Sequence, residues 1–182
     1  RIPDREVHRT DGKNLKETCS AMGDFAKRYG EVKQYAMIVP NAVEILSDKL
    51  PAFAPAADQG RYLDTLGKEL EEQGITVLDM RGVLKKNRDK KLYYKTDHHW
   101  TTEAAYLAFL EAGKTMGYNG SEITFDALPV TGGFQGTLSA KSGFRSGEKE
   151  ELEVFLPKDG SPSSVVNYVD EQKKTASFYD TG

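Results

Sequence analysis

An apolar run stands early in the sequence and reads Lys33-Gln34-Tyr35-Ala36-Met37-Ile38-Val39-Pro40. Its length and its mostly apolar composition predict a buried strand, which Pro40 ends because proline cannot donate to a sheet ladder. A second run of the same character reads Ile75-Thr76-Val77-Leu78-Asp79 and carries an acidic residue at its carboxyl end. Two buried strands are therefore expected in the first half of the chain.

A helical pattern separates the two predicted strands. It runs from Asp58, a suitable N-cap, to Gly74, and its apolar stripe consists of Tyr62, Leu63, Leu66 and Leu70. Strand, helix and strand in succession predict a right-handed crossover and a parallel sheet. Further helices are expected at residues 14–29 and 102–116, so the sequence predicts an α/β fold.

The character of the sequence changes from Ile123 onward. Short β-prone runs at residues 151–156, 164–169 and 175–179 are separated by Gly, Ser, Pro and Lys. They predict a β-meander at residues 122–179, inserted into a single domain that spans residues 1–182. The glycine-rich segment 132–138 is expected to be a loop, and it predicts no phosphate site because it lacks a strand-to-helix context.

Composition excludes several classes of protein. The 182 residues are 38% hydrophobic, which is enough for one sizeable core, and the formal net charge is only -3, so nucleic acid is not an expected partner. No run of 18 apolar residues occurs, so no transmembrane segment is predicted. The single cysteine, Cys19, cannot form an intrachain disulfide, and its place in a helical pattern predicts a buried apolar residue.

Two of the three histidines are adjacent in the segment Tyr93-Tyr94-Lys95-Thr96-Asp97-His98-His99-Trp100-Thr101. In an extended backbone, residues two apart share a face, so Asp97 and His99 are expected to lie together while His98 and Trp100 face the other way. The Asp97 carboxylate would then hold one imidazole nitrogen of His99 and leave the other free for a nucleophile or substrate. This is one half of an Asp-His-Ser acyl-transfer site, with Asp97 and His99 as its catalytic residues.

Three neighbours of this pair are candidates for contacting the substrate or supporting the site: Tyr94, His98 and Trp100. A helix is expected to begin directly after the segment, which places it at a strand-to-helix turn, where open α/β sheets bind ligands. The alternative is that the Asp-His pair only stabilises a turn in a domain that has no catalytic activity.

Adjacent histidines beside an aspartate also raise the possibility of a metal site. A hydrolytic metal site usually has three or more protein ligands, and the sequence offers no further nearby histidine, no Asp-x-Asp pair and no cysteine cluster. No metal and no cofactor is therefore predicted.

The segment 93–101, followed by Ala104-Ala105-Tyr106, resembles the DHHW protein family, which is similar to the SGNH-hydrolase-like domains of alginate O-acetyltransferases. Residues 38–41 look like the first strand of that group and the loop after it. Residues 134–138, with Lys141-Ser142-Gly143, resemble a downstream element of DHHW proteins.

This resemblance implies a flavodoxin-like, three-layer α/β fold with a parallel sheet. It also implies that Asp97 orients the imidazole and that His99 acts as general base for a serine that attacks an acyl donor. The implied activity is O-acetyl transfer to a polysaccharide, or acetyl-ester hydrolysis. The implied partners are an acyl donor and a carbohydrate acceptor, and the implied location is exported, at the cell surface or envelope.

The nucleophile is the missing part of this pattern. The related acetyltransferases carry it in an Asp-Ser pair after an apolar strand, and the 182 residues contain no Asp-Ser pair. The available candidates stand in loop or meander contexts, where serine is typical of turns and surfaces: Ser139, Ser142, Ser146 and Ser177. Either the serine lies beyond residue 182 and the sheet is C-terminally incomplete, or the chain is a non-catalytic glycan- or protein-binding relative.

Overall fold

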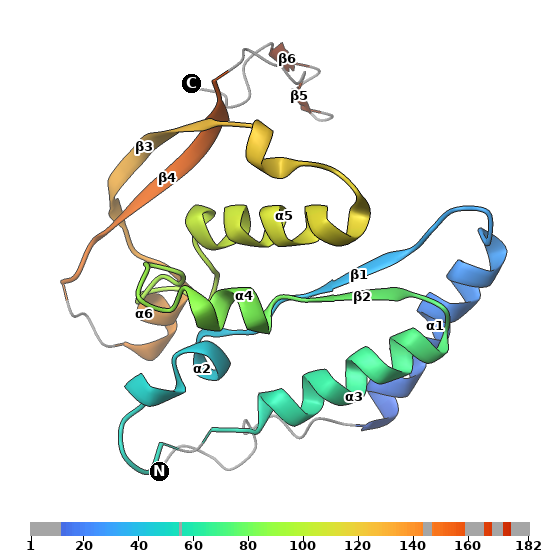
Figure 1. Cartoon of the computed structure of the whole chain (residues 1–182). Helices are drawn as coiled ribbons and strands as arrows, with labels where there is room; N and C mark the ends of the chain where they lie inside the picture. The colour runs from blue at the N-terminus through green and yellow to red at the C-terminus, as the bar shows by residue number, and fades with distance from the viewer. Residues whose placement is uncertain (1–11, 55, 144–146, 159–165, 169–172, 176–182) are drawn as a thin grey trace.

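The computed structural model of the chain describes residues 12–54, 56–143, 147–158, 166–168 and 173–175 (Figure 1). In chain order, the elements of this part of the chain are α1 (Gly12–Arg28), β1 (Tyr35–Ile38), α2 (Ala42–Ile45), the 3-10 helix η1 (Ser47–Lys49), α3 (Gln59–Glu72), β2 (Thr76–Asp79), α4 (Arg81–Lys86), α5 (Thr102–Met116), the 3-10 helix η2 (Gly120–Glu122), β3 (Phe125–Phe134), α6 (Thr137–Ser142), β4 (Glu150–Pro157), β5 (Val166–Tyr168) and β6 (Lys173–Thr175).

The two apolar runs form a parallel pair, β1 and β2, in which Tyr35 lies opposite Thr76. Helix α3 connects them, and its N-cap Asp58 accepts a hydrogen bond from the backbone N of Arg61 at 2.9 Å. The strand–helix–strand unit predicted from the sequence is confirmed.

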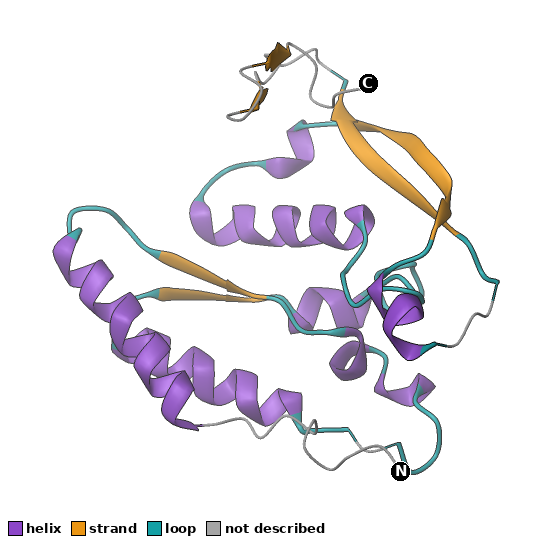
Figure 2. Ribbon diagram, turned by 180° about the vertical axis from the view of Figure 1, so that it is seen from behind, coloured by secondary structure: helices purple, strands orange, loops and turns teal. Residues whose placement is uncertain are grey.

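Helices cover both faces of this pair (Figure 2). Ile38 and Val77 pack with α1 and α3, whereas Leu78 packs on the opposite face with α4 and α5, as the alternation of side chains along a strand requires. Because both faces are covered, a nearly continuous apolar sequence suits these strands.

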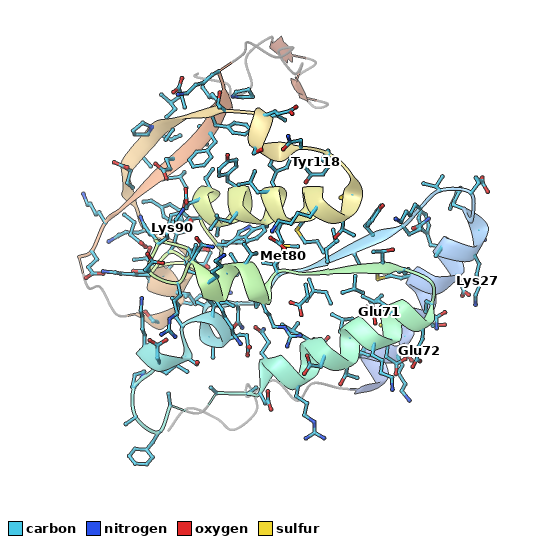
Figure 3. All side chains as sticks on the ribbon, in the orientation of Figure 1. Lys27, Glu71, Glu72, Met80, Lys90 and Tyr118 are labelled. Carbon is cyan, nitrogen blue, oxygen red and sulfur yellow. The ribbon has the colours of Figure 1, made fainter. Side chains whose placement is uncertain are left out.

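The two faces carry separate hydrophobic cores. The core under α1 and α3 consists of Leu15, Cys19, Ala26, Ile38, Leu63, Leu70 and Ile75, which confirms that Cys19 is buried. The core under α4 and α5 consists of Ile45, Leu78, Met80, Leu84, Leu92, Tyr93, Ala104, Ala108 and Ala112. Met80, directly after β2, is 1% exposed and lies between the strands and the helices of this second core (Figure 3).

The later part of the chain forms two antiparallel pairs, β3 with β4 and β5 with β6. Strands β4 and β5 confirm two of the predicted β-prone runs. Of the third run, only Thr175 falls in β6, and residues 176–179 lie outside the described part of the chain.

Segment 132–138 is not the single loop that was predicted. Its first three residues end β3, and residues 137–142 form α6. Strand β3 escaped prediction because Pro129 and two glycines interrupt it, and such residues are tolerated in a two-stranded ribbon with free edges.

None of the helices in the described part of the chain combines the length and the apolar character needed to cross a bilayer.

Tyr93 ties the end of β1 to the segment that precedes α5. Its buried hydroxyl donates a hydrogen bond to the carbonyl oxygen of Pro40 at 2.8 Å, and burial raises the pKa of Tyr93 to about 12. We expect Tyr93→Phe to lower the free energy of unfolding by about 1 kcal/mol, because the Pro40 carbonyl loses its partner.

The raised pKa of Tyr93 adds a pH signature to this prediction. Its contribution is complete below the ordinary tyrosine pKa of 10.0 and is lost as the pH rises towards about 12, so the difference between wild type and variant should shrink over that range. Urea unfolding at neutral and alkaline pH measures it. Tyr62→Phe is the control, since the Tyr62 hydroxyl has no hydrogen-bond partner among the described residues, and an equal loss in both variants would contradict the prediction.

Candidate active site

The segment from Tyr93 to Trp100 forms a tight loop. Its two ends make an isolated antiparallel bridge, Tyr94 N donates to His99 O at 3.3 Å, and residues 95–99 bend between them. The extended conformation expected for this segment is therefore wrong. Helix α5 follows at once, with Thr101 as its N-cap.

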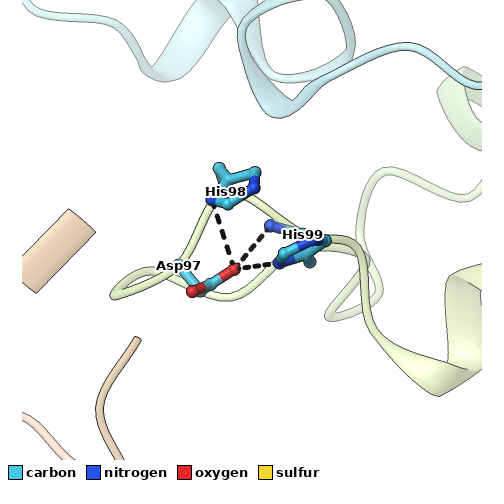
Figure 4. Close-up of side chains that lie close together, drawn as sticks. All are labelled: Asp97, His98 and His99. Carbon is cyan, nitrogen blue, oxygen red and sulfur yellow. Dashed lines mark hydrogen bonds and ion pairs between the residues drawn. The ribbon is translucent and has the colours of Figure 1, made fainter. Parts of the chain in front are cut away.

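Asp97 and His99 lie together, as predicted (Figure 4). Asp97 is 5% exposed, and its Oδ1 accepts hydrogen bonds from His99 Nδ1 at 2.5 Å and from His99 N at 2.9 Å. Its Oδ2 accepts from Thr137 N at 2.8 Å and from Thr137 Oγ1 at 3.1 Å. The His99 side chain is 66% exposed, so a buried carboxylate holds an accessible imidazole.

The environment of Asp97 fixes its charge. Burial opposes ionisation of this carboxyl, but the hydrogen bonds from Thr137 and His99 outweigh burial and hold the pKa of Asp97 well below its usual range. Ionised at neutral pH, Asp97 only accepts hydrogen bonds, so the proton between it and His99 sits on Nδ1. The Nε2 atom of His99 is then a lone-pair acceptor, the form that a general base requires.

His98 does not face away from this pair. Its ring lies beside that of His99 with the centroids 3.9 Å apart, and its Nδ1 lies 3.6 Å from Asp97 Oδ1. The expected opposite orientation assumed a strand, and the bends at residues 95–99 remove the alternation on which it depended.

The two aromatic candidates are placed differently. Trp100 is half-buried and packs against the core under α4 and α5. Tyr94 is 8% exposed, and its ring meets the ring of Phe134 edge to face at 4.9 Å. Both side chains are thus positioned to support the loop, and Tyr94 also borders the cavity described below.

Residues 136 and 137 belong to the site, although no local pattern in the sequence predicts a role for them. Thr137 binds Asp97 from 40 positions away, and Gly136 N donates to Thr96 Oγ1 at 3.1 Å. Ser139 N adds a bond to Thr96 O at 3.1 Å. The only sequence signal for this segment was its resemblance to a downstream element of DHHW proteins.

None of the candidate serines meets His99 in the described part of the chain. Ser139 and Ser142 lie on α6, and neither makes a hydrogen bond with the imidazole. Ser146 and Ser177 lie outside the described residues.

Glu150, the first residue of β4, fixes the same loop from the other side. It is 7% exposed and accepts hydrogen bonds from Lys95 N at 3.0 Å, from Thr96 N at 2.8 Å and from Thr96 Oγ1 at 2.7 Å. Burial opposes its ionisation, but these bonds outweigh burial and lower the pKa of Glu150. The hairpin of β3 and β4 therefore holds the loop that carries Asp97.

We expect Glu150→Gln to lower the free energy of unfolding by about 1 kcal/mol at neutral pH, because an amide has one acceptor oxygen in place of two. A lowered pKa means that the contribution of Glu150 is complete above its ordinary pKa of 4.5 and disappears as the pH falls through the folded value. The difference from wild type, measured by urea unfolding, should shrink in acid. Glu151→Gln alters the exposed neighbour and should change little, so an equal effect of the two variants would count against this role.

A cavity of about 420 Å³ opens beside His98, between α2, η1 and α6. It lies near the carboxyl end of β1, where α/β folds bind ligands. Its apolar wall consists mainly of Ala42, Val43, Leu46, Leu50 and Leu138, and its polar lining consists of Asn41, Lys49, Lys95, Asp97 and His98.

Asp97, His98 and His99 are the three side chains that could hold a metal here, and Asp97 would have to give up hydrogen bonds to do so. One ligand atom from each of Asp97, His98 and His99 lies within 4.8 Å of the others. However, Asp97 Oδ1 already accepts two hydrogen bonds from His99. The geometry is that of a hydrogen-bonded carboxylate–imidazole pair.

A family model described as the SGNH hydrolase-like domain of the acetyltransferase AlgX matches residues 5–124, well over half of the chain. A comparison with curated proteins gave no significant match.

Solved structures share the fold at low sequence identity. A DHHW family protein from Eubacterium siraeum is 19% identical, with a TM-score of 0.69 over 79% of this chain and 48% of its own. The O-acetyltransferase domain of Pseudomonas putida AlgJ is 17% identical, with a TM-score of 0.61 over 83% of this chain and 59% of its own. Bacillus cereus PatB1 is 20% identical, with a TM-score of 0.61 over 89% of this chain and 58% of its own.

The chain thus spans between 48% and 59% of the length of these three proteins. At such identities the likeness establishes the fold alone, and it agrees with the resemblance seen in residues 93–101. Together with the family match, it shows that the chain belongs to the family of SGNH hydrolase-like domains described for the acetyltransferase AlgX.

Proposed function

We propose that the protein is a serine-dependent O-acyltransferase or acyl esterase that acts on a glycan. The observation that carries the proposal is the 2.5 Å hydrogen bond between Asp97 Oδ1 and His99 Nδ1. A buried, ionised carboxylate fixes the tautomer of an exposed imidazole, which is the arrangement that activates a serine in acyl transfer. The shared fold with the O-acetyltransferase domain of AlgJ supports the same class of reaction.

The nucleophile would come from a strand outside residues 1–182 that extends the parallel pair. Parallel sheets of α/β proteins normally have more than two strands, and those strands are covered on both faces. Among the described residues, β1 and β2 pair only with each other, which leaves one edge of each strand open to a further strand. In this proposal the pair belongs to a three-layer, flavodoxin-like sheet, residues 1–182 belong to a single domain, and residues 122–179 are an insertion in it.

The chemistry follows from the position of the free nitrogen. As the serine Oγ attacks the acyl carbonyl, its proton passes to His99 Nε2, and Asp97 stabilises the imidazolium. The imidazolium gives this proton to the leaving oxygen of the donor. A sugar hydroxyl or water then gives its proton to His99 and takes the acyl group, and His99 returns the proton to the serine.

The partners of the reaction are an acyl donor and a carbohydrate acceptor, and the mechanism uses no cofactor. A glycan substrate fits an exported protein at the cell surface or envelope. Tyr94 and Trp100 would support the loop, and His98 would contact the substrate.

Labelling with phenylmethylsulfonyl fluoride tests the proposal in the full-length protein. Mass spectrometry should find one modified serine, outside residues 1–182, and hydrolysis of p-nitrophenyl acetate should fall in parallel with the labelling. His99→Ala protein is the control and should label far more slowly. A full-length protein that hydrolyses no acetyl ester and takes up no label would contradict the proposal.

A result of that kind would favour the second candidate, a non-catalytic glycan- or protein-binding domain. One observation favours this candidate: among the described residues, no serine hydroxyl lies within hydrogen-bonding distance of His99.

A further inference from the structure

The hydroxyl of Thr137 connects His98 to the Asp97 carboxylate. Thr137 Oγ1 lies 3.1 Å from Asp97 Oδ2 and 3.0 Å from His98 Nδ1. Because an ionised carboxylate has no proton to donate, the hydroxyl donates the hydrogen bond to Asp97. The hydroxyl oxygen must then accept a hydrogen bond from the N–H at His98 Nδ1. One carboxylate therefore sets the tautomer of both rings, directly for His99 and through a hydroxyl for His98.

Both rings consequently present Nε2 as an acceptor. Their side chains are 58% and 66% exposed, and their centroids are 3.9 Å apart. In the described part of the chain, neither Nε2 takes part in a hydrogen bond. Two neighbouring acceptors without a hydrogen-bond partner among the described residues are thus available to a molecule that binds beside this loop.

We propose that His98 is a substrate-binding residue whose Nε2 accepts a hydrogen bond from the hydroxyl next to the one that reacts at His99, so that the site selects vicinal diols. This inference rests on the proposed function. A carbonyl, carboxylate or phosphate oxygen has no proton to offer to Nε2, whereas a sugar carries adjacent O–H groups. His98 also borders the 420 Å³ cavity, and the aliphatic side chains of Val43 and Leu46 in its wall suit the C–H face of a ring.

The tautomer of His98 tests the first step of this inference without any need for activity. In full-length protein with ¹⁵N-labelled histidine, NMR at mildly alkaline pH should show His98 with its proton on Nδ1. Thr137→Val should shift that proton towards Nε2, the preferred site in a solvated ring. Thr65→Val removes a hydroxyl that bonds only within α3, so it should leave the signal unchanged. A wild-type His98 that is protonated on Nε2 would overturn the proposal.

Selectivity tests the second step. With p-nitrophenyl acetate as donor, we expect acylation per hydroxyl to be about tenfold faster for trans-1,2-cyclohexanediol than for cyclohexanol. This ratio corresponds to the free energy of one additional hydrogen bond in the transition state. His98→Phe should bring this ratio to about one, and His98→Gln, which keeps an acceptor oxygen, should restore part of it. A ratio that is the same in wild type and His98→Phe would refute the role of His98.

A protein without any esterase activity would refute the proposed function, and the role of His98 would still be decided by titration. The two alcohols are added in turn to the labelled protein while the Nε2 resonance of His98 is followed. A shift with the diol and none with cyclohexanol supports the inference, and no shift with either overturns it.

Discussion

Replacing His99 by alanine in the full-length protein is expected to lower the rate of acetyl-ester hydrolysis by about 10²- to 10⁴-fold, the range found when a general base is removed. Stability should fall by no more than about 1 kcal/mol. The reason is that Asp97 keeps three donors, the backbone N of residue 99 and the N and Oγ1 of Thr137. Initial rates on p-nitrophenyl acetate and urea unfolding of the same variant measure the two effects.

The companion variant Asp97→Asn tests whether Asp97 and His99 act as one catalytic unit or contribute to the rate independently. An asparagine can turn its NH₂ group towards His99 Nδ1, which moves the ring proton to Nε2 and disables the base. We therefore expect a loss of activity similar to that of His99→Ala, and little further loss in the double variant, because residues that act as a unit are not additive. Additive losses, or a loss of stability with full activity retained, would show that the pair only locks a turn.

Local patterns sufficed to predict helix α5 and the parallel strands β1 and β2 near the site. The helix at residues 102–116 is observed with the predicted bounds, since Thr101 caps its start and Gly117 adopts a left-handed conformation at its end. The parallel pair was predictable for a similar reason, because strands covered on both faces need continuous apolar runs. The close approach of Asp97 and His99 was predictable because the two residues stand only two positions apart in the chain.

The parts that escaped prediction depend on contacts between distant segments. Thr137 bonds to Asp97 and Glu150 bonds to Thr96, across 40 and 54 positions of the chain. No local sequence preference of either residue predicts such a hydrogen bond. The ring of His98 turned towards Asp97 because tertiary hydrogen bonds bent a segment whose composition favours a strand. Sequence pattern therefore located the Asp97–His99 pair, whereas the residues that hold this pair in place could be found only in the three-dimensional structure.

Gly136→Ala is expected to lower the free energy of unfolding by about 3 kcal/mol, the upper end of the usual cost of overpacking. An added Cβ would lie 2.7 Å from Asp97 Cγ and closer still to its Cβ and Oδ2. The backbone of Gly136, with φ of -86° and ψ of -173°, is open to any residue, so the effect is a steric one. Relief of the clash must separate Asp97 from Thr137, and a displacement of about 1 Å at a catalytic group can cost 10²-fold in rate.

Gly82→Ala supplies the matched control for this variant. Gly82 lies in α4, where an added Cβ meets no atom within 4 Å, so alanine should stabilise the protein by about 0.5–1 kcal/mol by favouring the helix. Urea unfolding gives both free energies, and proton NMR of the His99 Nδ1–H reports whether its bond to Asp97 survives. If Gly136→Ala matched wild type in stability and kept that proton signal, α6 could not be packed on the Asp97 carboxylate. The acceptor geometry derived for His98 would then lose its anchor, because Thr137 connects His98 to Asp97 only while α6 stays in contact with the loop.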